Sequence, residues 1–556
     1  FLSSFEVFCR HVSTTLPITI LNKIMQTTSS KSPYVVICDA GSTGTRLYVY
    51  HCPTCTDDER ILPFPSASSS APPMDVEIKE GDKVTPGISE QSPESVVRYL
   101  MPAIKKAKTV LVPSEFHSQT PLLVYATGGM RLLPDSQQAL LWDALVRGLQ
   151  QEAVPFIIHR DHFRTISGSD EAYLCGLAVN YLAGTLRSNL RRVTYFASKS
   201  DSATIRNKKL LGALDLGGAS AQIVSYAPKT QQRLPDPNAP PVQRSDFYAR
   251  SLLGYGFSPV MYKLDSYVSN QYGLEAPFGS MEATLTAAQP PLQLANPCYF
   301  RGYKKNHSDA ANGTALLHVG SGDAYFCQRL IVAAIVTPRQ KTNLHISSLL
   351  GDDISLLSGD YYATTLFYYT IDFVRTMLKE FLKRPPSPAV ADEYQNLLED
   401  LSAVSNPSME TISYAAHVAC GWDYFVLLEH KEAYQALTSP QQLPNRCLAL
   451  CYQIILLENM GFYRSKSTAR VHFVHEIRNH TAEWTLGAFL DRITHGPLVD
   501  KPNKSFLRAY NKGKPSLGLP LKVAFMFLSL AGAVLYLLRR RLNILMWRSK
   551  SKASRK

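Results

Sequence analysis

The feature that most constrains the fold is a short pattern that occurs twice. Val35 to Thr45 (VVICDAGSTGT) recurs as Leu211 to Ala221 (LGALDLGGASA), and Asp215 follows Asp39 by 176 positions. Each copy is an apolar strand, an aspartate, a glycine two residues later, and then small and hydroxyl-bearing residues. The alternative interpretation is a pair of ordinary turns. Two copies about one domain apart instead favour a repeated structural unit.

The composition of the repeated loops indicates anion binding. Glycines without Cβ atoms let successive backbone N–H groups converge on a phosphate oxygen, and Ser and Thr hydroxyls add donors. Asp39 and Asp215 would repel phosphate unless a cation lay between them. Mg²⁺ or Ca²⁺ fits, because these cations take carboxylate, water and phosphate oxygens together. Two facing loops are therefore predicted to hold a metal–polyphosphate from both sides.

Other segments give the class of the fold. The runs at 34–41, 122–127 and 210–218 are apolar and indicate buried strands. Segments 135–151 and 171–184 are expected to be helical, and 360–465 is more helical than the rest. Strands that alternate with helices predict an α/β protein.

Five segments, in order, carry a resemblance to a known family. They are DAGSTGTR (39–46), ATGGMRLLP (126–134), ISGSDEAYLCGLAVNYL (166–182), DLGGASAQI (215–223) and EWTLGAFL (483–490). The paired loops resemble the actin, Hsp70 and sugar-kinase superfamily. The five segments together resemble the nucleoside triphosphate diphosphohydrolase (apyrase) family, closest to its Golgi/lysosomal apyrase/UDPase branch. The resemblance implies two ribonuclease-H-like lobes around a nucleotide cleft, and hydrolysis of the terminal phosphate of nucleoside di- and triphosphates with Mg²⁺ or Ca²⁺.

The resemblance also implies which residues bind the metal and the phosphates. Asp39 and Asp215 would hold the divalent cation through water. The residues expected to contact phosphate are Ser42, Thr43, Gly44, Thr45, Arg46, Gly128, Gly218 and Ala219.

Glu171 matches the family's catalytic base. It would take a proton from water as the water attacks the terminal phosphorus in line. The residues expected to position this water are Ser220, Gln222 and Thr127. Arg131 would either support the loops or touch the substrate.

The nucleoside base is expected to stack on Tyr368, which matches a family aromatic. Arg446 stands where the opposing tyrosine is usual, and a guanidinium can also stack on a base. Trp484 is expected to pack the C-terminal helix against the first lobe.

The domain prediction divides the chain into consecutive parts. They are an N-terminal segment (1–33) that could be incomplete, a first lobe (34–185) with 470–498 packing back on it, a second lobe (186–469), a stalk (499–516), a transmembrane helix (517–538) and a basic cytoplasmic tail (539–556). The true N-terminus could add a signal peptide or a second transmembrane helix.

The transmembrane prediction rests on an uncharged apolar run at 523–538. Extended back to Leu517, the segment reaches the roughly 20 residues that span a bilayer. A buried core helix is the alternative, but the eight Lys and Arg residues of the tail favour a cytoplasmic flank. The catalytic body is then predicted to be lumenal or extracellular, in the Golgi or another endomembrane compartment, with the plasma membrane as a second option.

Charge and cysteine content support this placement. Without the eight tail charges the net charge of +13 falls to +5, so no nucleic-acid partner is expected. Ten cysteines agree with an oxidising compartment, and we predict the disulfides Cys298–Cys327 and Cys420–Cys447. Cys52 and Cys55 are expected to form a local disulfide or remain free. Glycosylation acceptors begin at Asn306, Asn312, Asn479 and Asn503.

Two other functions compete with nucleotide hydrolysis. One is a non-catalytic nucleotide-binding protein of the actin/Hsp70 type, which Glu171 argues against. The other is a phosphotransferase of the sugar-kinase type, which the predicted anchor and glycosylation sites disfavour. The sequence leaves the preferred base, the preference between di- and triphosphates and the oligomeric state open.

Overall fold

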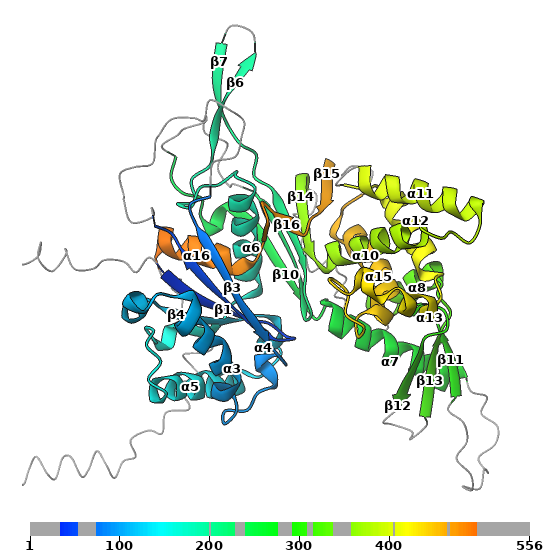
Figure 1. Ribbon diagram of the computed structural model, residues 1–556, viewed down its shortest axis with the longest axis horizontal. Coiled ribbons are helices and arrows are strands. Elements are labelled where there is room, and N and C mark those ends of the chain that lie inside the picture. The colour runs from blue at the N-terminus through cyan, green and yellow to red at the C-terminus, as the bar shows by residue number, and fades with distance from the viewer. Residues whose placement is uncertain are drawn as a thin grey trace, which may run out of the picture. The chain divides into compact units, whose positions relative to one another are not determined.

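The computed structural model describes residues 34–53, 74–199, 202–227, 239–275, 292–308, 315–336, 357–403, 406–463 and 468–496. All of them lie in one unit of the chain, Phe1–Pro497, and Figure 1 shows their helices and strands.

The first lobe is built on a five-stranded mixed sheet. Its strands are β1 (Tyr34–Ala40), β2 (Thr45–His51), β3 (Glu77–Val84), β4 (Leu122–Ala126) and β5 (Phe163–Thr165), in the order β3-β2-β1-β4-β5. The strands β1, β2 and β3 pair antiparallel, whereas β4 and β5 continue from β1 in parallel. The helices α3 (Val96–Lys106) and α5 (Asp135–Gln151) share one apolar core with this sheet. Within that core Leu100 and Leu145 belong to the same cluster as Val36.

The second lobe repeats this sheet. Its strands are β8 (Gly212–Leu216), β9 (Ser220–Tyr226), β10 (Phe247–Leu253), β14 (Ser358–Thr365) and β15 (Thr468–Phe473), in the order β10-β9-β8-β14-β15. The pairing directions match those of the first sheet strand for strand. Asp39 of β1 and Asp215 of β8 therefore occupy equivalent positions near the ends of equivalent strands. The predicted pair of ribonuclease-H-like α/β lobes is confirmed.

Two helices cross between the sheets. α6 (Gly168–Leu182) follows the first sheet in sequence but packs against β8, β9 and β10, where Gly176 lies against Val224. α16 (Trp484–His495) packs against α6, β1 and β2 (Figure 1). The hydroxyls of Tyr50 and Thr485 are 2.7 Å apart. A Cβ atom at Gly487 would collide with the carbonyl oxygen of Leu174, so glycine permits the close contact of α6 and α16.

These contacts differ from the predicted domain limits in two places. α6 lies within the predicted first lobe (34–185), yet its main sheet contacts are with the second lobe. The segment 470–498 was expected to pack on the first lobe, but β15 covers 470–473 and pairs in parallel with β14 of the second sheet. The reason is that backbone hydrogen bonds of β15 complete the second sheet, whereas α16 packs against β1 and β2 of the first.

Helices dominate the remainder of the second lobe. They are α7 (Phe257–Glu275), α8 (Ala324–Ile331), α10 (Leu366–Phe381), α11 (Pro388–Ala403), α12 (Met409–Cys420), α13 (Tyr424–Glu429), α14 (Lys431–Tyr434) and α15 (Arg446–Met460). A small sheet of β11 (Leu292–Asn296), β13 (Ala315–Gly320) and β12 (Lys304–Ser308) adjoins them. The short elements elsewhere are α4 (Gly128–Arg131), the hairpin β6 (Thr194–Lys199) and β7 (Ser202–Asn207), and the pair β16 (Glu476–Ile477) and β17 (His480–Thr481).

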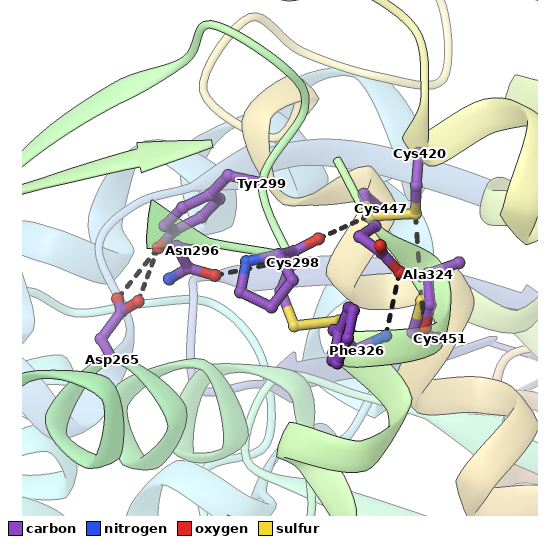
Figure 2. The surroundings of a disulfide bond; sticks show 12 residues. Asp265, Asn296, Cys298, Tyr299, Ala324, Phe326, Cys420, Cys447 and Cys451 are labelled. Carbon is purple, nitrogen blue, oxygen red and sulfur yellow. Dashed lines mark hydrogen bonds between the residues drawn. A yellow bond between two sulfur atoms is a disulfide. The ribbon is translucent and has the colours of Figure 1, made fainter. Parts of the chain in front are cut away.

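Both predicted disulfides are confirmed. Cys298–Cys327 joins the end of the β11 segment to α8, and Cys420–Cys447 joins the end of α12 to the start of α15 (Figure 2). Cys52 is also disulfide-bonded. Loops of this length give about 3.5 kcal/mol of stability per bridge in the chain-entropy view. Figure 2 also shows Asp265, which accepts a hydrogen bond from the Tyr299 hydroxyl at 2.8 Å.

The helices in the described ranges are all too short or too polar to span a bilayer. The predicted stalk, transmembrane helix and tail (499–556) lie outside those ranges, as do residues 1–33 and the acceptors Asn312 and Asn503. Asn306 and Asn479 are described, and both are exposed.

Candidate active site

The two aspartate loops line one cavity of about 300 Å³. The predicted site residues that it brings together are Asp39, Ser42, Thr43, Gly44, Arg46, Thr127, Gly128, Glu171, Asp215, Gly218, Ala219 and Ser220. Residues far apart in sequence meet there because each loop joins the first two strands of its sheet, β1–β2 or β8–β9.

Glycines allow the facing loops to approach closely. A Cβ atom on Gly218 would lie 2.5 Å from Oγ of Ser42, across the cavity. A Cβ atom on Gly128 would lie 2.8 Å from Cβ of Ala219 and 3.1 Å from Oγ of Ser220. Backbone N–H groups and hydroxyls from both lobes can therefore surround one phosphate chain.

The two aspartates differ in their surroundings. Oδ1 of Asp39 is buried and has no hydrogen-bond partner in the described structure. Oδ1 of Asp215 accepts a hydrogen bond from Oγ1 of Thr365 at 2.6 Å. Thr365 has a φ of 55°, and a left-handed backbone at a β-branched residue is strained. The fold thus holds Thr365 in an unfavourable conformation that aims its hydroxyl at Asp215.

Electrostatics at the aspartates fit a divalent cation. Burial raises the pKa of Asp39 well above its ordinary value, and the charges of Glu483, Glu171 and Asp215 raise it further. Burial also raises the pKa of Asp215, against the effect of the Thr365 hydrogen bond. Buried carboxylates that repel one another, one with an unpaired oxygen, match the donor set of Mg²⁺ or Ca²⁺. Asp39 and Asp215 are the residues that would hold such an ion.

Glu171 lies in the first turn of α6, where Oγ of the N-cap residue Ser167 accepts a hydrogen bond from the backbone N–H of Asp170. Its side chain is 8% exposed, and Oε2 accepts a hydrogen bond from Nη2 of Arg131 at 2.6 Å. Burial raises the pKa of Glu171 to about 7, and the Arg131 charge opposes this rise. Glu171 is therefore a carboxylate poised to change protonation near neutral pH.

Arg131 connects Glu171 to the second loop. Its Nη2 also donates to Oγ of Ser220 at 3.1 Å, and its Nη1 donates to the carbonyl oxygen of Ile166 at 3.2 Å. Nε2 of Gln222 donates to the same Ser220 oxygen at 2.7 Å. Of the two roles left open for Arg131, the structure shows the supporting one.

Thr45 and Gln222 do not line the cavity. Thr45 begins β2, and its Oγ1 accepts a hydrogen bond from the Tyr99 hydroxyl at 2.9 Å. Side chains alternate along a strand, so Thr45 shares the core face of Leu47, whereas Arg46 faces the cavity. The phosphate contact of Thr45 stays a prediction, and in this structure its hydroxyl is hydrogen-bonded to Tyr99. Gln222 is 2% exposed, and its side chain hydrogen-bonds two cavity residues, Ser220 and Glu171.

The two residues predicted to stack on the base, Tyr368 and Arg446, have other contacts in this structure. The Tyr368 ring stacks on His475, with centroids 5.2 Å apart, and its hydroxyl donates to Asp372 at 3.0 Å. Arg446 is 2% exposed, and its Nη2 donates to Thr438 and to the carbonyl oxygen of Leu437. The guanidinium is thus used inside the lobe and offers no face to a base.

Several cavity residues were missed from sequence. They are Tyr48, Lys83, Thr365, Tyr369 and Glu483, and Trp484 lines the cavity although only packing was expected of it. Tyr369 adjoins the predicted Tyr368, and one helical step turns a side chain by about 100°. Glu483 stands directly before Trp484 in the EWTLGAFL segment, which was a usable signal.

The chain has two lobes of one topology, and each presents an aspartate and a glycine-rich turn to a shared cavity that also holds a buried glutamate. This arrangement is typical of two-lobed phosphate-binding enzymes. Residues 25–507 match the GDA1/CD39 (nucleoside phosphatase) family. The chain belongs to this family, and the prediction of an apyrase-family hydrolase is confirmed. Its branch within the family stays a prediction.

Individual relatives are similar over most of their length. The chain is 25% identical over 521 residues to nucleoside-diphosphatase mig-23 of Caenorhabditis briggsae, which covers 90% of this chain and 84% of the relative. It is 25% identical over 518 residues to ectonucleoside triphosphate diphosphohydrolase 4 of Homo sapiens, covering 87% and 77%. A crystal structure of nucleoside triphosphate hydrolases from Neospora caninum superposes with a TM-score of 0.50 at 15% identity, covering 87% of this chain and 96% of that one. This last likeness concerns the fold alone.

Proposed function

We propose that the protein hydrolyses the terminal phosphate of nucleoside di- and triphosphates, with Glu171 as the base that activates water. The observation that carries the proposal is that Glu171 lines the same cavity as both aspartate loops. A pKa of about 7 suits a base that must be deprotonated near neutral pH and still accept a proton. The names of the relatives, a nucleoside-diphosphatase and a triphosphate diphosphohydrolase, support this substrate class.

The two loops would hold the polyphosphate between them. The hydroxyls of Ser42 and Thr43 and the backbone N–H groups of both turns supply donors from opposite sides. Nζ of Lys83 donates to Oγ1 of Thr43 at 3.1 Å, which places a positive charge beside the first loop. Arg46 adds a second positive charge to the cavity, although Glu80 binds its Nη1 at 2.9 Å.

In the chemical step, Glu171 takes a proton from the water whose oxygen attacks the terminal phosphorus. The new P–O bond forms as the bond to the bridging oxygen breaks, and that electron pair leaves with the shortened nucleotide. Arg131 holds Oε2 of Glu171, so we assign proton transfer to Oε1. Ser220 and Thr127, which line the cavity, would orient the water. A bound Mg²⁺ or Ca²⁺ would neutralise charge on the phosphate oxygens.

The nucleoside base would stack on Tyr369. Tyr369 lines the cavity and Tyr368 does not. The Tyr368 ring stacks on His475, whereas Tyr369 meets the same imidazole at a tilt of 58°. Stacking on an aromatic face tolerates every base, because each base has a π surface.

We further propose that the enzyme is a membrane glycoprotein with a lumenal or extracellular catalytic body, the Golgi being favoured. Two disulfides and two exposed glycosylation acceptors, Asn306 and Asn479, support an oxidising compartment. The apolar segment 517–538 and the basic residues after it support a single anchor.

Phosphate release from a panel of nucleoside di- and triphosphates, with Mg²⁺ or Ca²⁺, tests the function. Glu171→Gln is expected to lower kcat by about 10³-fold, since general base catalysis contributes roughly 10² to 10⁴. Asp170→Asn changes the neighbouring carboxyl, which does not line the cavity, and is expected to leave kcat unchanged. Absence of phosphate release by the wild type, or an unimpaired Glu171→Gln variant, would contradict the proposal.

A further inference from the structure

Glu483 is an acidic cavity residue with no role in the proposed mechanism. It occupies the position just before α16, where side chains usually cap the first N–H groups of a helix. Its side chain makes no capping hydrogen bond and instead lines the cavity with Asp39 and Asp215. Glutamate is not among the residues favoured at a helix N-cap. The Glu483 side chain instead hydrogen-bonds Tyr48, another residue of the cavity lining.

The charged groups around Glu483 show what is missing. Asp215 is the charge that most disfavours its ionised form, and Glu483 is the strongest charged neighbour of Asp39. Arg46 and a hydrogen bond with Tyr48 act in the opposite direction, but Nη1 of Arg46 is already held by Glu80. The fourth carboxylate of the cavity, Glu171, has its own ion pair with Arg131 at 2.6 Å.

Three carboxylates of this cavity therefore lack an ion-pair partner in the described part of the chain. Within the described ranges, Asp39, Asp215 and Glu483 form no ion pair with a lysine, arginine or histidine, and Oδ1 of Asp39 has no hydrogen-bond partner at all. Such a set is incomplete unless a positively charged ligand joins it.

We propose that Glu483 is a third carboxylate for the divalent cation held by Asp39 and Asp215, and that it favours Ca²⁺ over Mg²⁺. This inference rests on the proposed function. Ca²⁺ takes six to eight oxygen ligands in flexible arrangements, whereas Mg²⁺ requires a near-ideal octahedron and keeps several waters. An added carboxylate therefore benefits Ca²⁺ more than Mg²⁺.

The competing role for Glu483 is to hold Arg46. Glu80 provides a matched control, because it binds Arg46 at 2.9 Å and does not line the cavity. If the two glutamates served Arg46 alone, their removal would have the same effect on cation binding.

The test is calorimetric titration of Ca²⁺ alone and of Mg²⁺ alone into the full chain, for wild type, Glu483→Gln, Glu483→Asp and Glu80→Gln. Glu483→Gln is expected to weaken Ca²⁺ binding at least tenfold and Mg²⁺ binding less, while Glu80→Gln binds both ions as the wild type does. Glu483→Asp keeps the charge and is expected to restore part of the affinity. The rise in unfolding temperature on adding Ca²⁺ should decrease in parallel, and the midpoint without ions shows that each variant is folded.

Unchanged Ca²⁺ affinity in Glu483→Gln, an equal loss in Glu80→Gln, or no cation binding by the wild type would overturn the inference. The phosphate-release assay separates this failure from failure of the proposed function. A wild type that hydrolyses nucleotides while Glu483→Gln binds Ca²⁺ normally contradicts only the role of Glu483. A wild type that binds Ca²⁺ through Glu483 but releases no phosphate contradicts only the function.

Discussion

The two aspartate loops are equivalent in backbone topology and unequal in chemistry. Asp39 and Asp215 sit on matching strands, and each faces its antiparallel partner across the hairpin, Arg46 in one lobe and Gln222 in the other. In the first loop, Oδ1 of Asp39 is unpaired. In the second, Asp215 is held by Thr365, and Ser220 is joined through Arg131 to Glu171.

The chemical difference between the two loops arises outside the repeated hairpins. The repeated hairpins supply two similar anion-binding turns and two carboxylates. The unequal contacts come from elements outside the hairpins: α4 brings Arg131, α6 brings Glu171, and the end of β14 brings Thr365. We therefore assign cation and phosphate binding to both loops and water activation to the second alone.

The largest expected effect comes from removing either aspartate. Asp39→Asn and Asp215→Asn should each lower kcat by about 10³-fold, because several kcal/mol of charge stabilisation by the cation are lost.

The unfolding temperature of the cation-free protein should distinguish the two aspartate variants. Asp39→Asn removes a buried charge from a carboxylate whose Oδ1 has no hydrogen-bond partner, and should raise the unfolding temperature more than Asp215→Asn, which also disturbs the Thr365 hydrogen bond. Phosphate release measures the effect on kcat, and thermal unfolding measures the effect on stability. If either aspartate could be replaced with no decrease in kcat, the two aspartates would not have equivalent roles in cation binding.

Arg131→Ala should have the next largest effect. It leaves Glu171 buried without its ion pair, so we expect a loss of about 3–5 kcal/mol of stability and roughly 10²-fold in kcat. Because Arg131 lowers the pKa of Glu171, its removal raises that pKa further. The base must be deprotonated, so the acidic limb of the pH–rate profile should move to higher pH. Arg160→Ala breaks an exposed ion pair with Asp143 away from the cavity and should leave the profile in place.

The pKa of Glu171 also predicts a stability effect. The folded-state pKa of Glu171 is about 7, above its ordinary value of 4.5. Protonated Glu171 therefore contributes stability to the cation-free protein that is fully present below pH 4.5 and is lost as the pH rises through 7. Glu171→Gln should therefore flatten the fall in unfolding free energy between these values. Urea unfolding at several pH values measures the unfolding free energy of both proteins. Identical pH dependence in the wild type and in Glu171→Gln would contradict a raised pKa of Glu171.

The smallest expected effect compares the loop serines. Ser220→Ala removes the oxygen that accepts hydrogen bonds from both Arg131 and Gln222, and should lower kcat about tenfold with little change in KM. Ser42→Ala removes only a predicted phosphate donor and should mainly raise KM. Steady-state kinetics measures both constants for each variant. If both substitutions changed mainly kcat, or both mainly KM, the two loops would not differ in the way proposed.

The sequence predicted the parts of the site that local pattern determines. A strand that ends in an aspartate and a glycine turn is a local feature, so the sequence alone could predict Asp39, Asp215 and the loop residues that follow them. Strand alternation could also have shown that Thr45 faces the core, since Leu47 shares its face.

Contacts made by distant elements could not be predicted in this way. Packing of α16 on β1 and β2 brings Glu483 into the cavity, and the direction of the side chains along α10 decides that Tyr369 lines the cavity while Tyr368 does not. The predicted stacking role of Arg446 rested only on its position, where the family usually has a tyrosine. Its burial depends on Thr438 and Leu437, which no motif marks.

A crystal structure of the Glu171→Gln chain with Ca²⁺ and a non-hydrolysable nucleoside triphosphate analogue tests the central claim most directly. The account predicts the terminal phosphate between the Ser42 and Gly218 loops, the cation at Asp39 and Asp215, and residue 171 within hydrogen-bond reach of the terminal phosphate through one water. A terminal phosphate bound outside this cavity, or one reached by a single loop, would contradict it.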